Sequence, residues 1–146
     1  MERKLHLPPF TLETAQQKIK LVETAWNNKN PYEALEFFTE DSEWHSGPIF
    51  LNGHKEIKNF LIAKWKKEHK YKIIMQYWAH TDKSIAIQFI SEYCGENLMW
   101  YRACGNETWE FNDNGLIKNR FIRMNDFPIE EEERQITSKL VLVSSF

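Results

Sequence analysis

The sequence predicts an α+β fold in which three N-terminal helices are followed by a long antiparallel meander. Up to about residue 68 the apolar residues recur at three- and four-residue spacing, which is the helical period. Beyond that point the period falls to two, and short turn sequences separate four extended runs. Because one layer of helices cannot cover a long twisted sheet evenly, we expect the sheet to curl around the helices into a cone open at one end.

The first helix is predicted to begin at Thr11 or Thr14, because either hydroxyl can accept hydrogen bonds from the free N–H groups of a first helical turn. The helix ends before Pro31, since proline cannot continue a helix and disfavours helical backbone angles at the residue before it. Its apolar residues form one stripe that we expect to be buried: Leu12, Ala15, Ile19, Val22 and Trp26.

Two more helices and a short extended piece complete the first half. A short helix after Pro31 is predicted to turn its apolar side chains inward: Ala34, Leu35 and Phe38. The extended piece is centred on Trp44, and Asn52-Gly53 then forms a turn. A third helix runs from about His54 to Glu68, with one side formed by Ile57, Phe60, Leu61, Lys64 and Trp65.

Four strands form the second half. Two of them cover Tyr71 to His80 and Ser84 to Cys94. The other two lie within Trp100 to Ile129 and flank Asn112-Asp113-Asn114-Gly115, whose residues tolerate the left-handed φ of hairpin turns. There is no repeat, linker or low-complexity segment, so we expect a single domain over residues 1–146, with a core at about 8–135 and a tail at 136–146.

Composition excludes several classes of function. A formal net charge of -2 gives no reason to expect nucleic acid or an acidic membrane as a partner. Cys94 and Cys104 have no metal-ligand spacing, and the sequence contains no Gly-rich phosphate loop or nucleophile elbow, so we expect neither a metal nor a cofactor. The N-terminus lacks the apolar region of a secretory signal, and no run is long enough to span a membrane, which predicts a cytoplasmic protein. The acidic run Glu130 to Glu133 is interpreted as a solvated helix start.

Several segments between about residues 8 and 135 carry a family resemblance and keep its order: Pro8-Pro9-Phe10-Thr11, Phe38-Thr39-Glu40-Asp41-Ser42-Glu43-Trp44, Lys64-Trp65, Tyr71, Trp78-Ala79, Ile85-Ala86, Gly105-Asn106-Glu107-Thr108-Trp109-Glu110-Phe111, Gly115-Leu116 and Asn125-Asp126-Phe127-Pro128-Ile129. With them the chain resembles the nuclear transport factor 2-like (NTF2-like) superfamily, which includes SnoaL-like and ketosteroid isomerase-like proteins. It resembles most closely a family of unknown function in that superfamily. The resemblance implies a cone-shaped α+β barrel, often dimeric through the outer face of its sheet, and it implies no reaction.

The chain departs from those relatives at three places. His45-Ser46-Gly47 stands where relatives tend to have an Arg-rich segment, and Arg123 stands where they usually have a small residue. The tail from Ile136 to Phe146 also differs. Since these changes fall near the expected cavity, a shared ligand does not follow. The tail either caps the cone or extends the dimer.

Strand alternation predicts which side chains face the helices. If Ile85, Ile87 and Phe89 face inward, the next strand turns the following set inward: Tyr101, Ala103, Gly105, Glu107, Trp109 and Phe111. Arg102 then pairs with Glu92 on the outer face. The same alternation makes the inward set of the last strand Ile117, Asn119, Phe121, Arg123 and Asn125. A slip of one residue would reverse these assignments.

Glu107 is the main candidate for chemistry, because burial beside Trp109 and Tyr101 would disfavour its charged form, which is how a general acid or base is tuned. The alternative is a structural salt bridge, with Arg123 or Lys64 as partner. His45, beside Trp44 at the expected cone mouth, could shuttle a proton, since histidine titrates near neutral pH. It could equally face solvent.

We therefore expect a dimeric protein that binds a small, partly apolar molecule. The expected ligand contacts are Trp44, Lys64, Tyr101, Trp109 and Arg123. Lys64 would either meet an anionic ligand or extend its ammonium group to the protein edge. Catalysis remains open; the type expected is cofactor-free isomerisation, dehydration or hydrolysis with Glu107 or His45 as the base. The alternative function is a non-catalytic interaction module that binds a protein through the outer sheet face.

Overall fold

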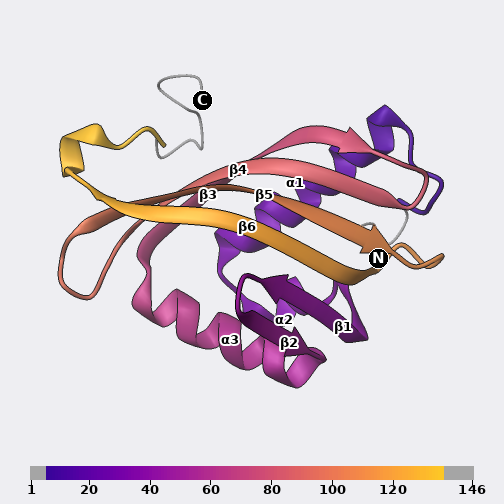
Figure 1. The fold of residues 1–146 in the computed structure, drawn as a ribbon, viewed down its shortest axis with the longest axis horizontal. Helices are drawn as coiled ribbons and strands as arrows, with labels where there is room; N and C mark the ends of the chain where they lie inside the picture. Colours follow the sequence, from indigo (N-terminus) through magenta and orange to yellow (C-terminus); the bar gives the residue numbers. More distant parts are fainter. Residues whose placement is uncertain (1–5, 137–146) are drawn as a thin grey trace.

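Six strands form one curved, unclosed sheet that bends over three helices (Figure 1). The computed structural model describes residues 6–136. The helices are α1 (Leu12–Asn28), α2 (Pro31–Leu35) and α3 (His54–Lys67), and the strands are β1 (Phe38–Ser46), β2 (Ile49–Asn52), β3 (His69–His80), β4 (Ser84–Cys94), β5 (Trp100–Phe111) and β6 (Ile117–Ile129). This architecture confirms the predicted α+β cone.

The strand order is β2-β1-β6-β5-β4-β3. The predicted meander of four long strands is therefore correct, and β1 extends it by pairing parallel to β6. β2 was not predicted, because four residues are too few to show a period. It pairs antiparallel with β1 through a turn at Gly47, whose φ of 58° suits glycine.

α1 begins as the sequence predicts. Thr11 is the N-cap, and its hydroxyl accepts from the N–H of Thr14, while the Thr14 hydroxyl accepts from the N–H of Thr11. The expected stripe is buried except at Leu12, which is 52% exposed in the first turn. The helix ends at Asn28 before Pro31.

Side chains of α1 protect the free edge of β3, the last strand of the sheet. The Asn27 amide donates to the carbonyl of Ile73 and accepts from the N–H of the same residue, each at 2.9 Å. The Glu23 carboxylate accepts from the N–H of Met75 at 2.8 Å. These bonds satisfy backbone groups that a bare sheet edge would leave unpaired, and they fix α1 inside the curve.

The register between β4 and β5 confirms the predicted inward face. Ile87 lies opposite Glu107, and Ile85 lies opposite Trp109. On the outer face, the Arg102 Nε donates to Glu92 Oε2 at 2.9 Å, as predicted.

A β-bulge in β6 reverses part of the prediction for the last strand. Ile117 lies opposite Phe111, but Asn119 lies opposite Glu110, so one extra residue is inserted in β6. The buried Ser42 hydroxyl of β1 donates to the carbonyl of Ile117 at 3.0 Å, which supports the bulge. Ile117 faces inward as predicted, whereas the inward placement predicted for Asn119, Phe121, Arg123 and Asn125 is wrong. Arg120 and the residues at even positions after it face inward instead.

The chain after β6 returns across the outer face of the sheet. The acidic run forms the exposed 3-10 helix η2 (Glu131–Glu133), so its solvated character is confirmed. The buried Glu92 carboxylate accepts from the N–H groups of Gln135 and Ile136, and Ile136 packs on Ile74 and Ile90. The tail beyond Ile136 lies outside the described residues, so neither role proposed for it is tested.

Cys94 and Cys104 are free cysteines, and both are half-buried. Within residues 6–136, no helix has the length and apolar character that a membrane crossing requires.

Lys18 gives a testable pH dependence. Its side chain is 1% exposed, and its Nζ donates to the carbonyl of Gly115 at 3.2 Å. Burial lowers the pKa of Lys18 from 10.5 to about 8. The unfolded chain therefore binds more protons than the folded protein between these values, so folding becomes more favourable as the pH rises. Between pH 7 and 9.5, we expect the free energy of unfolding of wild type to rise by about 2 kcal/mol relative to that of Lys18→Met. Urea unfolding measures both values.

The difference in free energy of unfolding between the two proteins is used because the titratable groups that they share contribute equally to both. Parallel stability curves for wild type and Lys18→Met over this pH range would contradict the assignment.

Candidate functional site

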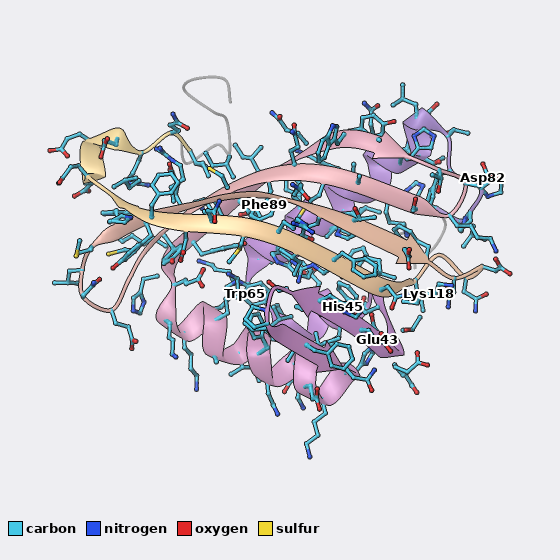
Figure 2. The ribbon with its side chains drawn as sticks, in the orientation of Figure 1. Glu43, His45, Trp65, Asp82, Phe89 and Lys118 are labelled. Atoms are coloured by element: carbon cyan, nitrogen blue, oxygen red, sulfur yellow. The ribbon has the colours of Figure 1, made fainter. Side chains whose placement is uncertain are left out.

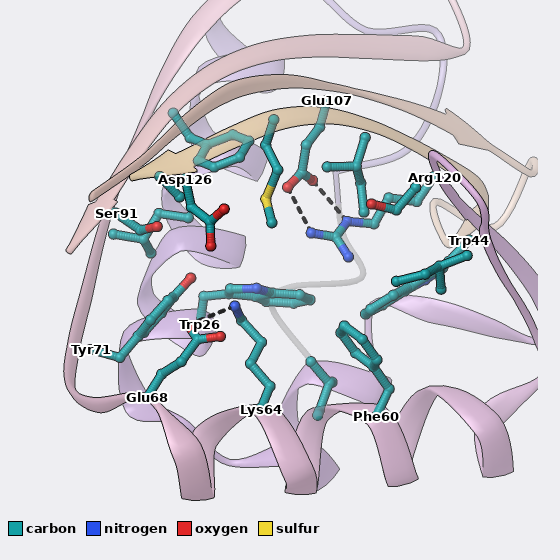
Figure 3. A pocket seen from close by; sticks show the side chains of 18 of the residues that line it. Trp26, Trp44, Phe60, Lys64, Glu68, Tyr71, Ser91, Glu107, Arg120 and Asp126 are labelled. Atoms are coloured by element: carbon teal, nitrogen blue, oxygen red, sulfur yellow. Dashed lines mark hydrogen bonds and ion pairs between the residues drawn. The ribbon is translucent and has the colours of Figure 1, made fainter. Parts of the chain in front are cut away.

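A cavity of about 90 Å³ lies between α3 and the inner face of the sheet (Figure 3). Among its lining residues, the exposed ones mark the opening: Ile49 on β2, Phe60 on α3, and Met124 and Asp126 on β6. The opening therefore lies between the start of the sheet, α3 and the end of β6.

The cavity exists because the middle of β5 carries small residues on its inner face. Ala103 lines the cavity, and Gly105 follows on the same face. A Cβ at Gly105 would lie 2.1 Å from the carbonyl oxygen of Arg123, so the close approach of β5 and β6 requires glycine there. The larger ring of Phe89 on β4 faces this space and supplies an apolar wall.

A buried ion pair forms one side of the cavity. Arg120 Nε donates to Glu107 Oε1 at 2.8 Å, and Arg120 Nη2 donates to Glu107 Oε2 at 2.6 Å. The Trp109 indole N–H also donates to Glu107 Oε1, at 2.8 Å. Glu107 is 2% exposed and Arg120 is 6% exposed. Bidentate pairing of this kind fixes both position and orientation of a guanidinium.

Two indole rings pack against the Arg120 guanidinium. Its Cζ lies 4.2 Å from the centroid of Trp44 and 5.2 Å from that of Trp26. Cation–π contacts add to the ion pair in a site that water reaches poorly. Arg120 is thus held between a carboxylate and two aromatic rings (Figure 3).

This geometry changes the interpretation of Glu107. The sequence left open a general base or a structural salt bridge, and it named Arg123 or Lys64 as the partner for the bridge. The partner is Arg120, because the bulge turns this residue inward. Since both carboxylate oxygens already accept strong hydrogen bonds, Glu107 orders Arg120 and is poorly placed to take a proton from a ligand.

Lys64 on α3 and Glu68, the C-cap of α3, lie on the opposite side of the cavity (Figure 3). Lys64 Nζ lies 2.9 Å from Glu68 Oε1 and 4.9 Å from the centroid of the Tyr71 ring. Lys64 therefore lines the cavity, as expected of a ligand contact, but its charge is already balanced by Glu68.

Tyr71 and Ser91 bring hydroxyl groups to the third side. Tyr71 is 2% exposed and Ser91 is 3% exposed, and both line the cavity. Neither hydroxyl has a hydrogen-bond partner among residues 6–136, and Figure 3 shows the Tyr71 hydroxyl directed toward the cavity. Burial first, then the charges of Glu68 and Glu107, raises the pKa of Tyr71 well above 10, so its hydroxyl stays protonated and can donate.

Asp126 lies beside these hydroxyls near the opening. It accepts a hydrogen bond from the Tyr93 hydroxyl at 3.2 Å, and no cation of the described chain pairs with it. Burial raises the pKa of Tyr93, and the nearby carboxylates of Glu68 and Asp126 raise it further. Asp126 is the cavity carboxylate that forms no ion pair within residues 6–136.

The remaining predicted site residues lie elsewhere. His45 and Arg123 line an open depression on the outer face, where His45 stacks on Phe121 with centroids 4.7 Å apart and lies 3.3 Å from Glu43 (Figure 2). The two strands thus turn both side chains away from the inner cavity. Trp109 is 1% exposed in the core and meets the cavity only through Glu107.

Tyr101 also lies outside the cavity lining. Its ring stacks on Tyr93 with centroids 5.4 Å apart, and its hydroxyl accepts from the Asn97 amide at 2.8 Å. Of the seven predicted site residues, the cavity brings together Glu107, Trp44 and Lys64.

Sequence reasoning missed Arg120, Tyr71, Ser91 and Asp126. Alternation along β4 could have found Ser91, because it shares a face with Phe89 and Tyr93. The bulge hid Arg120 and Asp126, since nothing in the sequence announces the extra residue. The described residues hold no cluster of three His, Cys, Asp or Glu side chains that could bind a metal ion.

Residues 8–137 match a protein family described as a protein of unknown function, DUF1348. No curated protein matches the chain. Solved structures with the same fold include a pinacolase from Penicillium brevicompactum, with 12% identity, a TM-score of 0.68, and coverage of 77% of this chain and 86% of that one.

Two bacterial structures give similar values. A putative polyketide cyclase from Xanthomonas campestris has 15% identity, a TM-score of 0.67 and coverage of 76% and 90%. An NTF2-like protein of unknown function from Burkholderia pseudomallei has 13% identity, a TM-score of 0.67 and the same coverage. At these identities the likeness concerns the fold alone, and it confirms the NTF2-like fold that the sequence resemblance implied.

The ion pair can be tested by comparing single and double variants. Arg120→Met leaves the Glu107 carboxylate buried without a cation, so we expect a loss of about 3–5 kcal/mol in the free energy of unfolding. Arg120→Met combined with Glu107→Gln removes both charges and should lose clearly less than the sum of the two single variants. Urea unfolding followed by tryptophan fluorescence measures the free energy of unfolding of the two single variants and the double variant relative to wild type. Additive losses would contradict a coupled pair.

Proposed function

Because the chain belongs to the DUF1348 family of unknown function, we propose a function from its cavity: it binds a compact, partly apolar molecule that carries a hydrogen-bond-accepting oxygen. The finding that carries the proposal is the Tyr71 hydroxyl, which belongs to a buried side chain, lines the cavity, stays protonated and has no hydrogen-bond partner among the described residues. A ligand oxygen that accepts from this hydroxyl would add a hydrogen bond worth about 1 kcal/mol.

The rest of the lining suits such a molecule. Trp44, Phe60 and Phe89 offer apolar surface, while Ser91 and Tyr71 offer polar atoms on one side. Small-molecule sites commonly combine a mainly apolar wall with a few convergent polar groups. The names of two neighbours in fold, a pinacolase and a putative polyketide cyclase, agree with a cavity used for small molecules.

Ligand binding can be tested with cyclohexanone as a probe and ligand-observed NMR as the readout. We expect Tyr71→Phe to weaken binding about tenfold, because the main donor is lost. Ala103→Leu should abolish binding, because the added side chain fills the cavity. Tyr101→Phe is the matched control, since it removes a phenol hydroxyl outside the cavity lining. Equal effects of Tyr71→Phe and Tyr101→Phe would contradict the proposal.

Cofactor-free proton transfer on the bound molecule is the second candidate function. It is favoured by Asp126, a cavity carboxylate with no cation on it within residues 6–136. Asp126 would accept a proton next to a carbonyl group, and the Tyr71 hydroxyl would donate a hydrogen bond to the carbonyl oxygen as negative charge develops there.

Exchange of the α-protons of cyclohexanone in D₂O, followed by NMR, measures this activity directly. We expect the protein to accelerate exchange, Asp126→Asn to remove the acceleration, and His45→Gln to retain it because His45 lies on the outer face. Loss of exchange in His45→Gln with retention in Asp126→Asn would overturn this assignment.

The interaction module remains the alternative, and the proposed homodimer uses the same surface. Phe50, Phe121 and Phe127 are 54%, 40% and 41% exposed on the outer face, where a monomer would leave apolar rings in water. Sedimentation of wild type against Phe121→Lys tests this surface. A dimer that Phe121→Lys dissociates supports the homodimer, and a wild-type monomer contradicts it.

A further inference from the structure

We propose that the molecule bound in the cavity is electrically neutral and has a hydroxyl group next to a carbonyl group, as in a small hydroxy ketone. This inference rests on the proposed ligand-binding function and specifies the class of ligand. It follows from the charges, hydrogen-bonding groups and size of the cavity.

The charges of the lining exclude a carboxylate or phosphate. Two cations, Lys64 and Arg120, face the cavity together with three carboxylates, Glu68, Glu107 and Asp126. Both cations are already engaged by carboxylates, Arg120 with Glu107 and Lys64 with Glu68. An anionic ligand would therefore have to compete with these pairs, and it would also meet the uncompensated charge of Asp126.

A cation is disfavoured for a different reason. An aromatic cavity with a free carboxylate could in principle hold an ammonium group through cation–π contacts. Here Arg120 already covers Trp44 and Trp26, and Lys64 already lies over Tyr71. A cationic ligand would thus find the best ring faces occupied and two like charges nearby.

The polar groups that take part in no ion pair fit a molecule with both a donor and an acceptor. Tyr71 donates, whereas Asp126 accepts. Ser91 and Asp126 belong to one cross-strand row, because each lies opposite Ala103. Their backbones are thus about 10 Å apart, two strand spacings, which leaves room for one small molecule between their side chains.

Size limits the class further. The cavity of about 90 Å³ corresponds to about six to nine water-sized positions. A ligand of about that many non-hydrogen atoms fills it without rearrangement. Figure 3 shows Tyr71 and Asp126 on the same side of the cavity, so a ligand carbonyl oxygen at the Tyr71 hydroxyl would leave a neighbouring ligand hydroxyl on the side of Asp126. The hydrocarbon part would then lie against Phe89 and Phe60.

The test compares four probes that share one ring: 2-hydroxycyclohexanone, cyclohexanone, cyclohexanecarboxylate and cyclohexylammonium. Dissociation constants are measured by NMR titration on wild type and on Ala103→Leu as the blocked control. We expect 2-hydroxycyclohexanone to bind more tightly than cyclohexanone, and each ion to bind at least about tenfold more weakly than the hydroxy ketone.

Asp126→Asn keeps the size of the side chain and removes its charge. It should tighten cyclohexanecarboxylate and weaken 2-hydroxycyclohexanone, since the amide accepts more weakly than the carboxylate. If cyclohexanecarboxylate binds wild type as tightly as the hydroxy ketone, the inference is wrong while the ligand-binding function stands. If no probe binds in a manner that Ala103→Leu blocks, both fail. The comparison on wild type decides the inference even where a variant is unstable.

Discussion

The buried ion pair between Glu107 and Arg120 is the interaction on which the interior of this protein depends. Glu107 receives three hydrogen bonds, two from Arg120 and one from Trp109. Arg120 in turn lies over Trp44 and Trp26, so the pair joins β5 and β6 to β1 and α1. A buried ion pair is weak evidence for added stability, but its loss on one side leaves a charge that the core cannot solvate. The clearest effect of the pair here is to specify which side chains of β5, β6, β1 and α1 pack together.

The pair also determines which groups remain for a ligand. Because Glu107 and Arg120 engage each other, and Lys64 and Glu68 do the same, four of the five charged groups that line the cavity are balanced locally. The polar groups of the lining that lie outside these ion pairs include Tyr71, Ser91, Asp126, Ser46 and the Trp44 indole N–H, which has no partner among the described residues. The cavity therefore has a mainly apolar wall, hydrogen-bond donors on one side and one carboxylate without a cation near its opening. This arrangement supports both ligand binding and a proton-transfer step.

Most of the fold follows from local pattern, because helical and strand periods are set by the residues of each element. The cap at Thr11, the end before Pro31 and the register of β4 against β5 were predictable in this way. The site was predictable only where alternation continues without interruption, as at Glu107. The bulge in β6 depends on Ser42, a residue about 75 positions earlier that hydrogen-bonds to the bulged backbone. Such a long-range contact leaves no local signal, so Arg120 and Asp126 were assigned to the wrong face.

The most direct test of this account is a crystal structure of the protein grown with 2-hydroxycyclohexanone. The account predicts the molecule in the inner cavity, with its carbonyl oxygen about 2.7 Å from the Tyr71 hydroxyl and its own hydroxyl donating to Asp126. The Glu107–Arg120 pair should keep its bidentate geometry in that structure. A ligand bound instead at the outer face beside His45 and Arg123, or an inner cavity in which Arg120 leaves Glu107 to bind the ligand, would contradict it.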